Sequence, residues 1–291
     1  NDSPITLEVP VSKWTPTGTW KPQNFDSKFR GKMTIREAVE QSRNVPTIEL
    51  LKEIGPNNAL RLAQRLGISS YIEPQLSMAL GAYEVSLLEL AGAYTALANS
   101  GVRTKPRAIT RVHDKKGNLL DRSVPQAEKV LDENVVAVMV DIMQGVIRRG
   151  TGHRANIGRP AAAKTGTSQE FRDAWFIGFV PQLLVAVWVG NDNNRSMKGV
   201  AEVSVCPRAW KAFMEEALRP EPVIPFAPPQ GMVEKTFCLV SGQLATPYCP
   251  KGKVRTDIFF PTNAPHEECS VHGEASDDGS EDEEVEGEET S

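Results

Sequence analysis

Two nearly continuous apolar segments, joined by a short turn, constrain the fold of this 291-residue chain more than any other feature. The first covers residues 174–180 and the second residues 183–190, with Pro181-Gln182 between them. An apolar strand without polar alternation is typical of a strand that is covered on both faces. We therefore expect an antiparallel hairpin in the centre of a sheet, preceded by another strand at residues 161–167.

Helical patterns on both sides of these strands would supply the layers that cover the sheet. Capping boxes at Thr34-Ile-Arg-Glu37 and Ser86-Leu-Leu-Glu89 each mark the start of a helix. Apolar residues at helical spacing predict an amphipathic helix over residues 132–149 and another around residues 207–217. The expected fold class is α/β (α+β), with a central antiparallel sheet covered by helices.

Composition divides the chain into four parts. Residues 1–218 contain all of these helices and strands. Five prolines between residues 220 and 229 indicate a linker over residues 219–231, and residues 232–273 have the pattern of a small β appendage. Residues 274–291 hold ten acidic residues and no lysine or arginine, so we expect this tail to be disordered.

The charge of the chain gives little guidance to a partner. Without the acidic tail, 33 basic residues face 27 acidic ones, the total of 37 less the ten in the tail. This excess is ordinary for a solvated surface, and we expect no nucleic-acid partner. No apolar segment is long enough to span a membrane. Because the chain starts at Asn1 without a signal-like stretch, we expect any membrane anchor only in a longer protein.

The cysteines leave two interpretations open for the appendage. A turn at Ser241-Gly242 would bring Cys238 and Cys249 together, so these two residues form a possible disulfide. His266 and His272, with Cys249 and Cys269, would alternatively offer four zinc ligands, but the paired CxxC spacing of a zinc ribbon is absent, and we assign no metal site. The pairing of the other two cysteines is left open; the full set is Cys206, Cys238, Cys249 and Cys269.

Two short polar motifs carry the chemistry of the sequence. Lys164-Thr-Gly-Thr167 ends the strand expected before the central hairpin. Ser42-Arg-Asn44 follows the first capped helix and precedes Val45-Pro46, a break that we expect to leave both polar side chains on a loop. A lone Ser-x-Asn arises about once per chain of this length by chance, and Lys-Thr-Gly alone is compatible with an exposed turn. The occurrence of both motifs in this order supports a functional role more strongly than either motif alone.

Ser-x-Asn followed by Lys-Thr-Gly is the order found in β-lactamases and penicillin-binding proteins. Further segments, among them Ala79–Val85, Gly150-Thr-Gly152 and Asp173–Gly178, resemble the transpeptidase domain of class A, bifunctional penicillin-binding proteins over residues 1–218. Residues 225–272 resemble the short extension that often follows in that family. The resemblance implies the penicillin-recognising acyl-serine transferase fold.

The first motif of the family, Ser-x-x-Lys, is missing, because no serine of the chain is followed three positions later by lysine. Members of the family carry it before the second motif, so we expect the nucleophilic serine and its lysine base on an upstream segment outside this chain. Arg43 stands where β-lactamases usually have Asp, which favours a transpeptidase. The sequence leaves open whether the upstream segment is a separate polypeptide.

The resemblance implies a catalytic role for three residues of the motifs. The hydroxyl of Ser42 would pass a proton between the missing lysine and the leaving nitrogen. Asn44 would hold that lysine and the substrate amide, and Lys164 would supply positive charge to the site.

Three further residues, all in Lys164-Thr-Gly-Thr167, would bind the substrate or a penicillin. The hydroxyls of Thr165 and Thr167 would hold the terminal carboxylate, which the carboxylate of a penicillin imitates. Gly166 would let the substrate lie along the strand as an added β-element. The backbone N–H of Thr167 would complete an oxyanion hole.

The function implied by the resemblance is that of a peptidoglycan D,D-transpeptidase. The absent serine would attack D-Ala-D-Ala of a stem peptide, and an amine from a neighbouring strand would resolve the acyl-enzyme. β-Lactams would occupy the same site, no cofactor is expected, and the location would be extracytoplasmic, on the periplasmic side of a bacterial membrane. One alternative is a serine β-lactamase or D,D-carboxypeptidase, which would transfer the acyl group to water. The other is a non-catalytic penicillin-binding or scaffold module, which the missing nucleophile favours.

Overall fold

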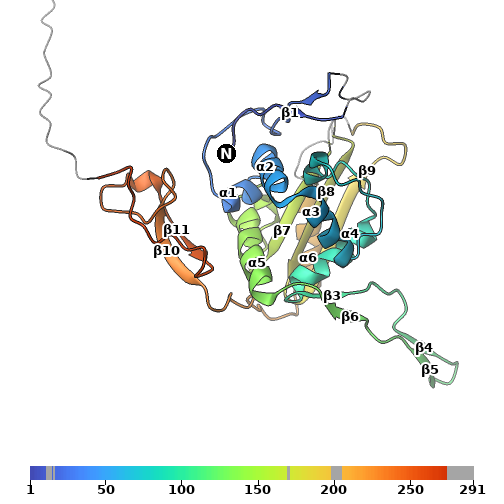
Figure 1. Ribbon diagram of the computed structural model, residues 1–291. Coiled ribbons are helices and arrows are strands. Elements are labelled where there is room, and N and C mark those ends of the chain that lie inside the picture. The colour runs from blue at the N-terminus through green and yellow to red at the C-terminus, as the bar shows by residue number, and fades with distance from the viewer. Residues whose placement is uncertain (11–14, 16, 169–170, 198–204, 274–291) are drawn as a thin grey trace, which may run out of the picture. The chain divides into compact units, whose positions relative to one another are not determined.

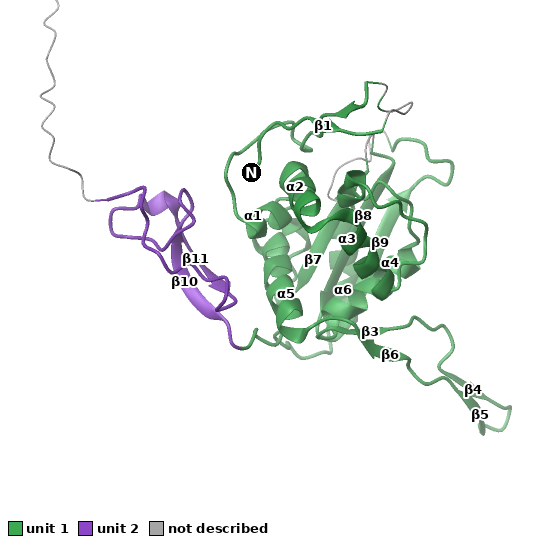
Figure 2. Ribbon diagram, in the orientation of Figure 1, with its two compact units in different colours: residues 1–230 green, residues 231–291 purple. Residues whose placement is uncertain are grey.

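The computed structural model describes residues 1–273, except residues 11–14, 16, 169–170 and 198–204. It divides the chain into two compact units, residues 1–230 and residues 231–291 (Figure 2). The boundary falls at the end of the expected linker. The acidic tail, residues 274–291, lies outside the described residues, so its expected disorder remains a prediction.

A three-stranded antiparallel sheet forms the centre of the first unit (Figure 1). Its strands are β7 (Ala162–Thr167), β8 (Asp173–Val180) and β9 (Leu183–Gly190), with β8 in the middle. The expected hairpin and the strand before it are therefore confirmed. Strand β9 differs from the expectation: it is an edge strand of the sheet and is only half-buried along most of its length.

Helices cover both faces of this sheet, as expected from the sequence (Figure 1). On one face, Val140 and Met143 of α5 (Glu133–Arg148) pack on Ala162 and Phe179. On the other face, the helix α6 (Val205–Ala217) packs its apolar side chains on Phe176 and its neighbours. Side chains that alternate along β7 and β8 thus enter two separate apolar layers.

Gly178 in the middle of β8 makes room for the largest side chain of the α6 layer. The indole of Trp210 is fully buried and donates a hydrogen bond from Nε1 to the carbonyl oxygen of Gly178, 3.1 Å away. A Cβ at this position would lie 2.8 Å from Trp210 Cε2 and 3.0 Å from Phe176 Cε1. The glycine of the Asp173–Gly178 segment is therefore required by packing.

Five helices lie within residues 35–98, and both expected capping boxes are present. Their order is α1 (Ile35–Glu40), α2 (Asn44–Ile54), α3 (Pro56–Arg65), the short 3₁₀ helix η1 (Leu76–Leu80) and α4 (Leu87–Ala98). The expected break at Val45-Pro46 is wrong, because Pro46 lies in the first turn of α2. The backbone N–H groups of a first helical turn have no partner within the helix, so proline, which lacks this group, does not interrupt it. Among the described residues, no helix combines the length and apolarity needed to cross a membrane.

Small two-stranded pairs complete the first unit. They are β1 (Leu7–Glu8) with β2 (Thr19–Trp20), β3 (Val102–Thr104) with β6 (Ala127–Lys129), and β4 (Arg111–His113) with β5 (Leu119–Arg122). A further 3₁₀ turn, η2 (His153–Ala155), follows α5.

The second unit contains an antiparallel pair, β10 (Val233–Cys238) with β11 (Val254–Phe259), and a 3₁₀ turn, η4 (Lys251–Lys253). This confirms strands in the expected appendage. The structure does not contain the disulfide considered for Cys238 and Cys249, because both residues carry free thiols. Each of these thiols lies instead in a group that also includes Cys269 and His272.

Candidate active site

The two polar motifs meet in space. Lys164 Nζ donates a hydrogen bond to Ser42 Oγ across a distance of 2.6 Å, although the residues are 122 positions apart in the chain. The same ammonium group donates to the carbonyl oxygen of Thr165, 2.9 Å away. The structure thus brings together a hydroxyl and a lysine that only the order of the motifs had connected.

Ser42 lies in the short connection between α1 and α2. Its backbone is in the left-handed region, with φ of 50°, which is unfavourable for a residue with a side chain. The chain turns at this point so sharply that Arg43 N donates back to the carbonyl oxygen of Ala38, 2.8 Å away. The strained turn directs the Ser42 hydroxyl to Lys164, and strain of this kind is characteristic of functional sites.

Arg43, the middle residue of Ser42-Arg-Asn44, holds this turn from the opposite side. The guanidinium is 4 % exposed and donates from Nε to Asp2 Oδ2 and from Nη1 to Asp26 Oδ2, each at 2.9 Å. It also donates to the carbonyl oxygen of Lys28. Asp2 is fully buried, and Arg43 forms an ion pair with it at 2.8 Å. Arg43 therefore anchors the motif to the lead-in segment rather than facing the substrate.

Asn44 is the first residue of α2 and is held by the same lead-in. Its backbone N–H donates to Asn24 Oδ1 at 2.9 Å, and its Nδ2 donates to the carbonyl oxygen of Gln23 at 2.7 Å. The side-chain oxygen has no hydrogen bond to Ser42 or Lys164 among the contacts of the described residues. The structure therefore places Asn44 beside Ser42 in the chain without joining it to the serine–lysine pair.

A second loop is tied to the end of α1. Thr151 N donates to the carbonyl oxygen of Glu40 at 3.1 Å, and Arg149 Nε donates to Glu40 Oε2 at 2.7 Å. A Cβ at Gly150 would collide with the carbonyl oxygen of Glu40, so this position needs glycine. Glu40 thereby fixes the loop after α5 against the loop that carries Ser42.

This second loop reaches the other motif through one hydroxyl. Thr151 Oγ1 lies 2.7 Å from Thr165 Oγ1, and Thr165 is 9 % exposed. Sequence reasoning noted Gly150-Thr-Gly152 only as a family likeness and assigned no role to Thr151, Glu40 or Arg149. The glycines on either side of Thr151 were the available signal, because they mark a close approach of two backbones.

Burial changes the acid–base character of Lys164. Desolvation lowers the pKa of its ammonium group from 10.5 to about 8. The opposing residue in the sheet is Ile177, which offers no negative charge to restore the pKa. Lys164 is thus mostly protonated at neutral pH but able to exchange a proton within about one pH unit of its pKa.

The register of the sheet determines which way the backbone of Lys164-Thr-Gly-Thr167 points. Ser168 N donates to the carbonyl oxygen of Asp173 at 3.0 Å, on the β8 side. Because bonded and non-bonded pairs alternate in an antiparallel ladder, the amides of Thr167 and Thr165 point away from β8. The bond from Lys164 Nζ to the Thr165 carbonyl lies on the same outer side. No strand of the described residues pairs with this edge.

The lack of a side chain at Gly166 leaves room for the neighbouring Trp175. It lies opposite Trp175, and a Cβ at Gly166 would lie 3.2 Å from Trp175 Cβ. The indole of Trp175 in turn packs on that of Trp188, with ring centroids 6.2 Å apart. These two aromatic rings stabilise the sheet behind the motif.

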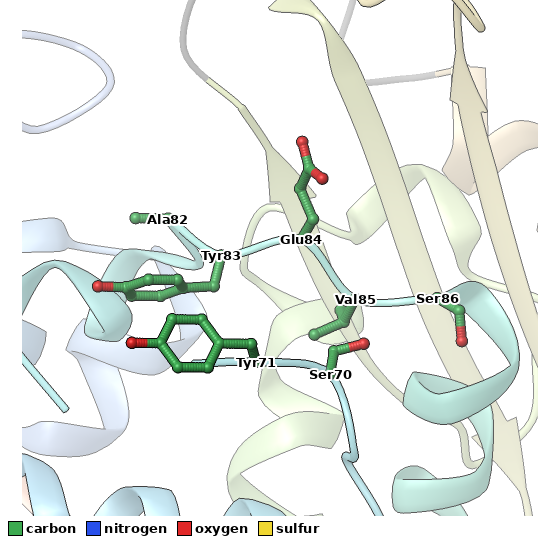
Figure 3. Close-up of a pocket in the computed structure, with 7 residues that line it drawn as sticks. All are labelled: Ser70, Tyr71, Ala82, Tyr83, Glu84, Val85 and Ser86. Atoms are coloured by element: carbon green, nitrogen blue, oxygen red, sulfur yellow. The ribbon is translucent and has the colours of Figure 1, made fainter. Parts of the chain in front are cut away.

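An open hollow elsewhere in the first unit is lined by Tyr71, Tyr83, Glu84 and their neighbours (Figure 3). The Glu84 carboxylate points away from both tyrosine rings. Tyr83 Oη accepts a hydrogen bond from Gln75 Nε2, which holds the loop at 82–86 in place. No residue of the two motifs lines this hollow.

Comparison with known proteins identifies the class to which this fold and site belong. Residues 6–206 match the penicillin binding protein transpeptidase domain. This match covers more than half of the chain, so the chain belongs to that family. Residues 228–274 match the C-terminal domain of penicillin-binding protein 1A. Both parts of the resemblance found in the sequence are confirmed.

The most similar curated relatives include two proteins called penicillin-binding protein 1A. The one from Aquifex aeolicus is 36% identical over 217 residues, which are 74% of this chain and 30% of the relative. The one from Neisseria flavescens is 36% identical over 243 residues, which are 80% of this chain and 30% of the relative. The chain therefore spans about 30% of the length of these relatives.

Solved structures agree with this assignment. Penicillin-Binding Protein 1A from Haemophilus influenzae superposes with a TM-score of 0.82 at 25% identity, covering 92% of this chain and 45% of that one. The PonA1 protein from Mycobacterium tuberculosis, solved in complex with penicillin V, gives a TM-score of 0.64 at 25% identity, covering 78% of this chain and 64% of that one. The expected fold class is thereby confirmed.

Proposed function

We propose that this chain supplies the second and third motifs of a serine-type peptidoglycan D,D-transpeptidase. The nucleophile and its lysine base belong to a Ser-x-x-Lys segment outside the chain. The observation that supports this proposal best is the 2.6 Å hydrogen bond from Lys164 Nζ to Ser42 Oγ. A hydroxyl that accepts from an ammonium group keeps its own proton free to donate, as a proton relay requires.

Acylation would proceed by exchange of an amide bond for an ester bond. The nucleophilic serine oxygen forms a bond to the carbonyl carbon of the penultimate D-Ala, and the bond from that carbon to the terminal D-Ala nitrogen breaks. The leaving nitrogen takes the proton of Ser42, and Ser42 is reprotonated from the nucleophile's proton by way of the base. Lys164 holds the Ser42 hydroxyl in position and supplies positive charge throughout. An acceptor amine then attacks the ester, and the proton moves in the reverse direction.

The free edge of β7 would bind the peptide. The backbone amide and carbonyl groups of Thr165 and Thr167 point outwards there, so an extended peptide can add to the sheet. The Thr165 hydroxyl is shared with Thr151, which leaves the Thr167 hydroxyl as the better partner for the terminal carboxylate. The Thr167 N–H would face the developing oxyanion. Asn44 would complete the site by turning its amide to the incoming lysine and substrate.

The alternatives differ in the molecule that accepts the acyl group and in whether the serine is acylated at all. A β-lactamase or carboxypeptidase would transfer the acyl group to water, and a scaffold module would not be acylated. The relatives called penicillin-binding protein 1A favour the transpeptidase. In that case the site would face the extracytoplasmic side of a bacterial membrane, where stem peptides and β-lactams meet it.

Labelling with a fluorescent penicillin tests the proposal in the longer protein that carries this chain. We expect Lys164→Ala to slow acylation by about 10²–10³, the usual effect of removing one preorganised charge from a site. Lys115→Ala, in the exposed turn between β4 and β5, is the matched control and should label like the wild type. Acylation of Lys164→Ala at the wild-type rate would contradict the proposal.

The product of the second step separates the remaining candidates. With a stem-peptide donor and an added amine acceptor, mass spectrometry should find the donor peptide joined to the acceptor by a new amide bond, together with released D-Ala. Release of D-Ala with hydrolysed donor only would indicate a carboxypeptidase. The 291-residue chain by itself should not be labelled, because it has no Ser-x-x-Lys.

A further inference from the structure

Four metal-ligating side chains converge in the second unit. Cys238, Cys249, Cys269 and His272 each contribute one donor atom, and the four atoms lie within 4.8 Å of one another. The three cysteines are 0 %, 6 % and 7 % exposed in that order. His266, which sequence reasoning grouped with the cysteines, is exposed and outside this group.

The spacing of the donor atoms fits a tetrahedral ion. With Zn–S near 2.3 Å and Zn–N near 2.0 Å, a sulfur and a nitrogen ligand of one tetrahedron are about 3.5 Å apart. In the structure His272 Nδ1 lies 3.5 Å from Cys238 Sγ and 3.4 Å from Cys269 Sγ. An ion in the centre would therefore meet these donors with little movement of the side chains.

The backbone of the unit is organised around the same group. Cys238 ends β10, and its N–H donates to the carbonyl oxygen of Gln243 at 2.8 Å across a turn completed by Gly242, with φ of 80°. Leu244 then pairs with the last ligand segment, because Cys269 N donates to its carbonyl oxygen at 2.9 Å. The turn of residues 238–244 and the distant segment at Cys269 are thus fixed side by side before any ligand is considered.

Donors from the surrounding chain point at the sulfur atoms. Val240 N donates to Cys238 Sγ, and Thr246 N donates to Cys249 Sγ, each at 3.4 Å. Ser241 Oγ donates to Cys269 Sγ at 3.2 Å. Hydrogen bonds of this kind stabilise thiolates and orient them as metal ligands.

The composition of the core gives a second, independent reason for a metal. The buried cluster of the unit consists of the three cysteines, with Val240, Ala245 and Val254 packed around them. A folded segment of about 40 residues usually needs a disulfide or a metal, because it cannot bury enough apolar surface. Three cysteines cannot all pair with one another, so a single disulfide would leave a thiol and the histidine without a role.

We propose that residues 231–273 form a closed structural zinc site with three cysteine ligands and one histidine ligand. All four tetrahedral positions are filled by protein, so the ion holds the unit together and leaves no position for a substrate. The proposal is independent of the transpeptidase function, because every ligand lies in the second unit. Zinc replaces the Cys238–Cys249 disulfide in this account.

Metal analysis and cobalt substitution test the site directly in the 291-residue chain. Chain purified under reducing conditions without chelator should contain one zinc ion per molecule by elemental mass spectrometry. Chain reloaded with Co²⁺ should show sulfur-to-cobalt charge-transfer bands and the intense visible bands of a tetrahedral ion. A metal-free preparation that binds neither Zn²⁺ nor Co²⁺ at equimolar concentration would overturn the proposal.

The chain supplies matched controls for both ligand types. His272→Asn should lose the tetrahedral cobalt spectrum or weaken zinc binding by at least tenfold, whereas His266→Asn should keep both. Cys269→Ser should behave like His272→Asn, whereas Cys206→Ser changes a buried thiol of the first unit and should keep the metal. Equal zinc content in His272→Asn and the wild type would show that the assignment is wrong.

The protection of the second unit from proteolysis, and of its thiols from modification, is a further readout that does not depend on variants. Removal of zinc with a strong chelator should speed proteolysis within residues 231–273 and expose three additional reactive thiols. Re-addition of Zn²⁺ alone should reverse both effects. Peptide mapping that finds a Cys238–Cys249 disulfide in the native chain would contradict the zinc site.

Discussion

Replacement of Arg43 by methionine should destabilise the first unit by about 3 kcal/mol, because it leaves a buried carboxylate without its counter-ion. Asp2 is fully buried and Arg43 is 4 % exposed, so water cannot replace the lost partner. Two hydrogen bonds to the Asp2 carboxylate remain, from Asn24 Nδ2 at 2.6 Å and from Arg30 N at 3.1 Å. They place the expected cost at the lower end of the range of about 3–5 kcal/mol for a broken buried pair.

Urea unfolding followed by tryptophan fluorescence measures this cost. All five tryptophans lie in residues 1–230, so the signal reports on the first unit. Arg30→Met is the matched control: its ion pair with Asp26 is long, at 3.4 Å, and exposed, so its loss should cost less than about 1 kcal/mol.

A double variant separates the ion pair from general packing. Asp2→Asn removes the buried charge, so the pair Asp2→Asn and Arg43→Met should recover about 2 kcal/mol relative to Arg43→Met alone. The reasoning is refuted if Arg43→Met unfolds within about 1 kcal/mol of the wild type, or if Asp2→Asn gives no recovery in the double variant.

Three more predictions concern the candidate site and the sheet. Lys164 has a folded-state pKa of about 8 against an ordinary value of 10.5, so the folded chain gains stability as the pH rises from 8 to 10.5. After allowance for partial exposure, this gain is worth about 2 kcal/mol. Lys164→Met should abolish it in unfolding experiments across that pH range. At Ser42, where φ is 50°, the Gly variant should be more stable than the Ala variant by about 1 kcal/mol in the same assay, while both lose acylation in the longer protein. Gly178→Ala should destabilise the first unit by about 1–3 kcal/mol, because its Cβ would meet Trp210 at 2.8 Å, and an unchanged midpoint would contradict the packing argument.

Local patterns in the sequence were sufficient for most of the fold. Capping boxes at Thr34 and Ser86 and the apolar segments at 174–180 and 183–190 predicted elements that the structure contains, because each depends on residues close together in the chain. The prediction of a break at Val45-Pro46 was wrong because proline is tolerated in the first helical turn. The half-burial of β9 depends on its neighbours in the sheet, which its own residues do not specify.

The candidate site was only partly accessible from the sequence. The order of Ser42 and Lys164 suggested a shared site, but the sequence alone did not give the 2.6 Å contact or the burial that lowers the pKa of Lys164. In the sequence, Arg43 served only to favour a transpeptidase over a β-lactamase, whereas the structure makes it the partner of Asp2. Such pairings join segments far apart in the chain, so no local pattern reports them.

The amino-acid sequence by itself determined which residue types are available and where the helices and strands form. It supplied the two motifs, the glycines at Gly150 and Gly178, and the cysteines and histidines of the second unit. Only the tertiary structure decided which of these residues meet: it joined Ser42 to Lys164, and it selected His272 instead of His266 as the partner of the cysteines. The physical reason is that helix caps and strand periodicity act between neighbours in the chain, whereas hydrogen bonds and metal coordination depend on distances of a few ångströms in space.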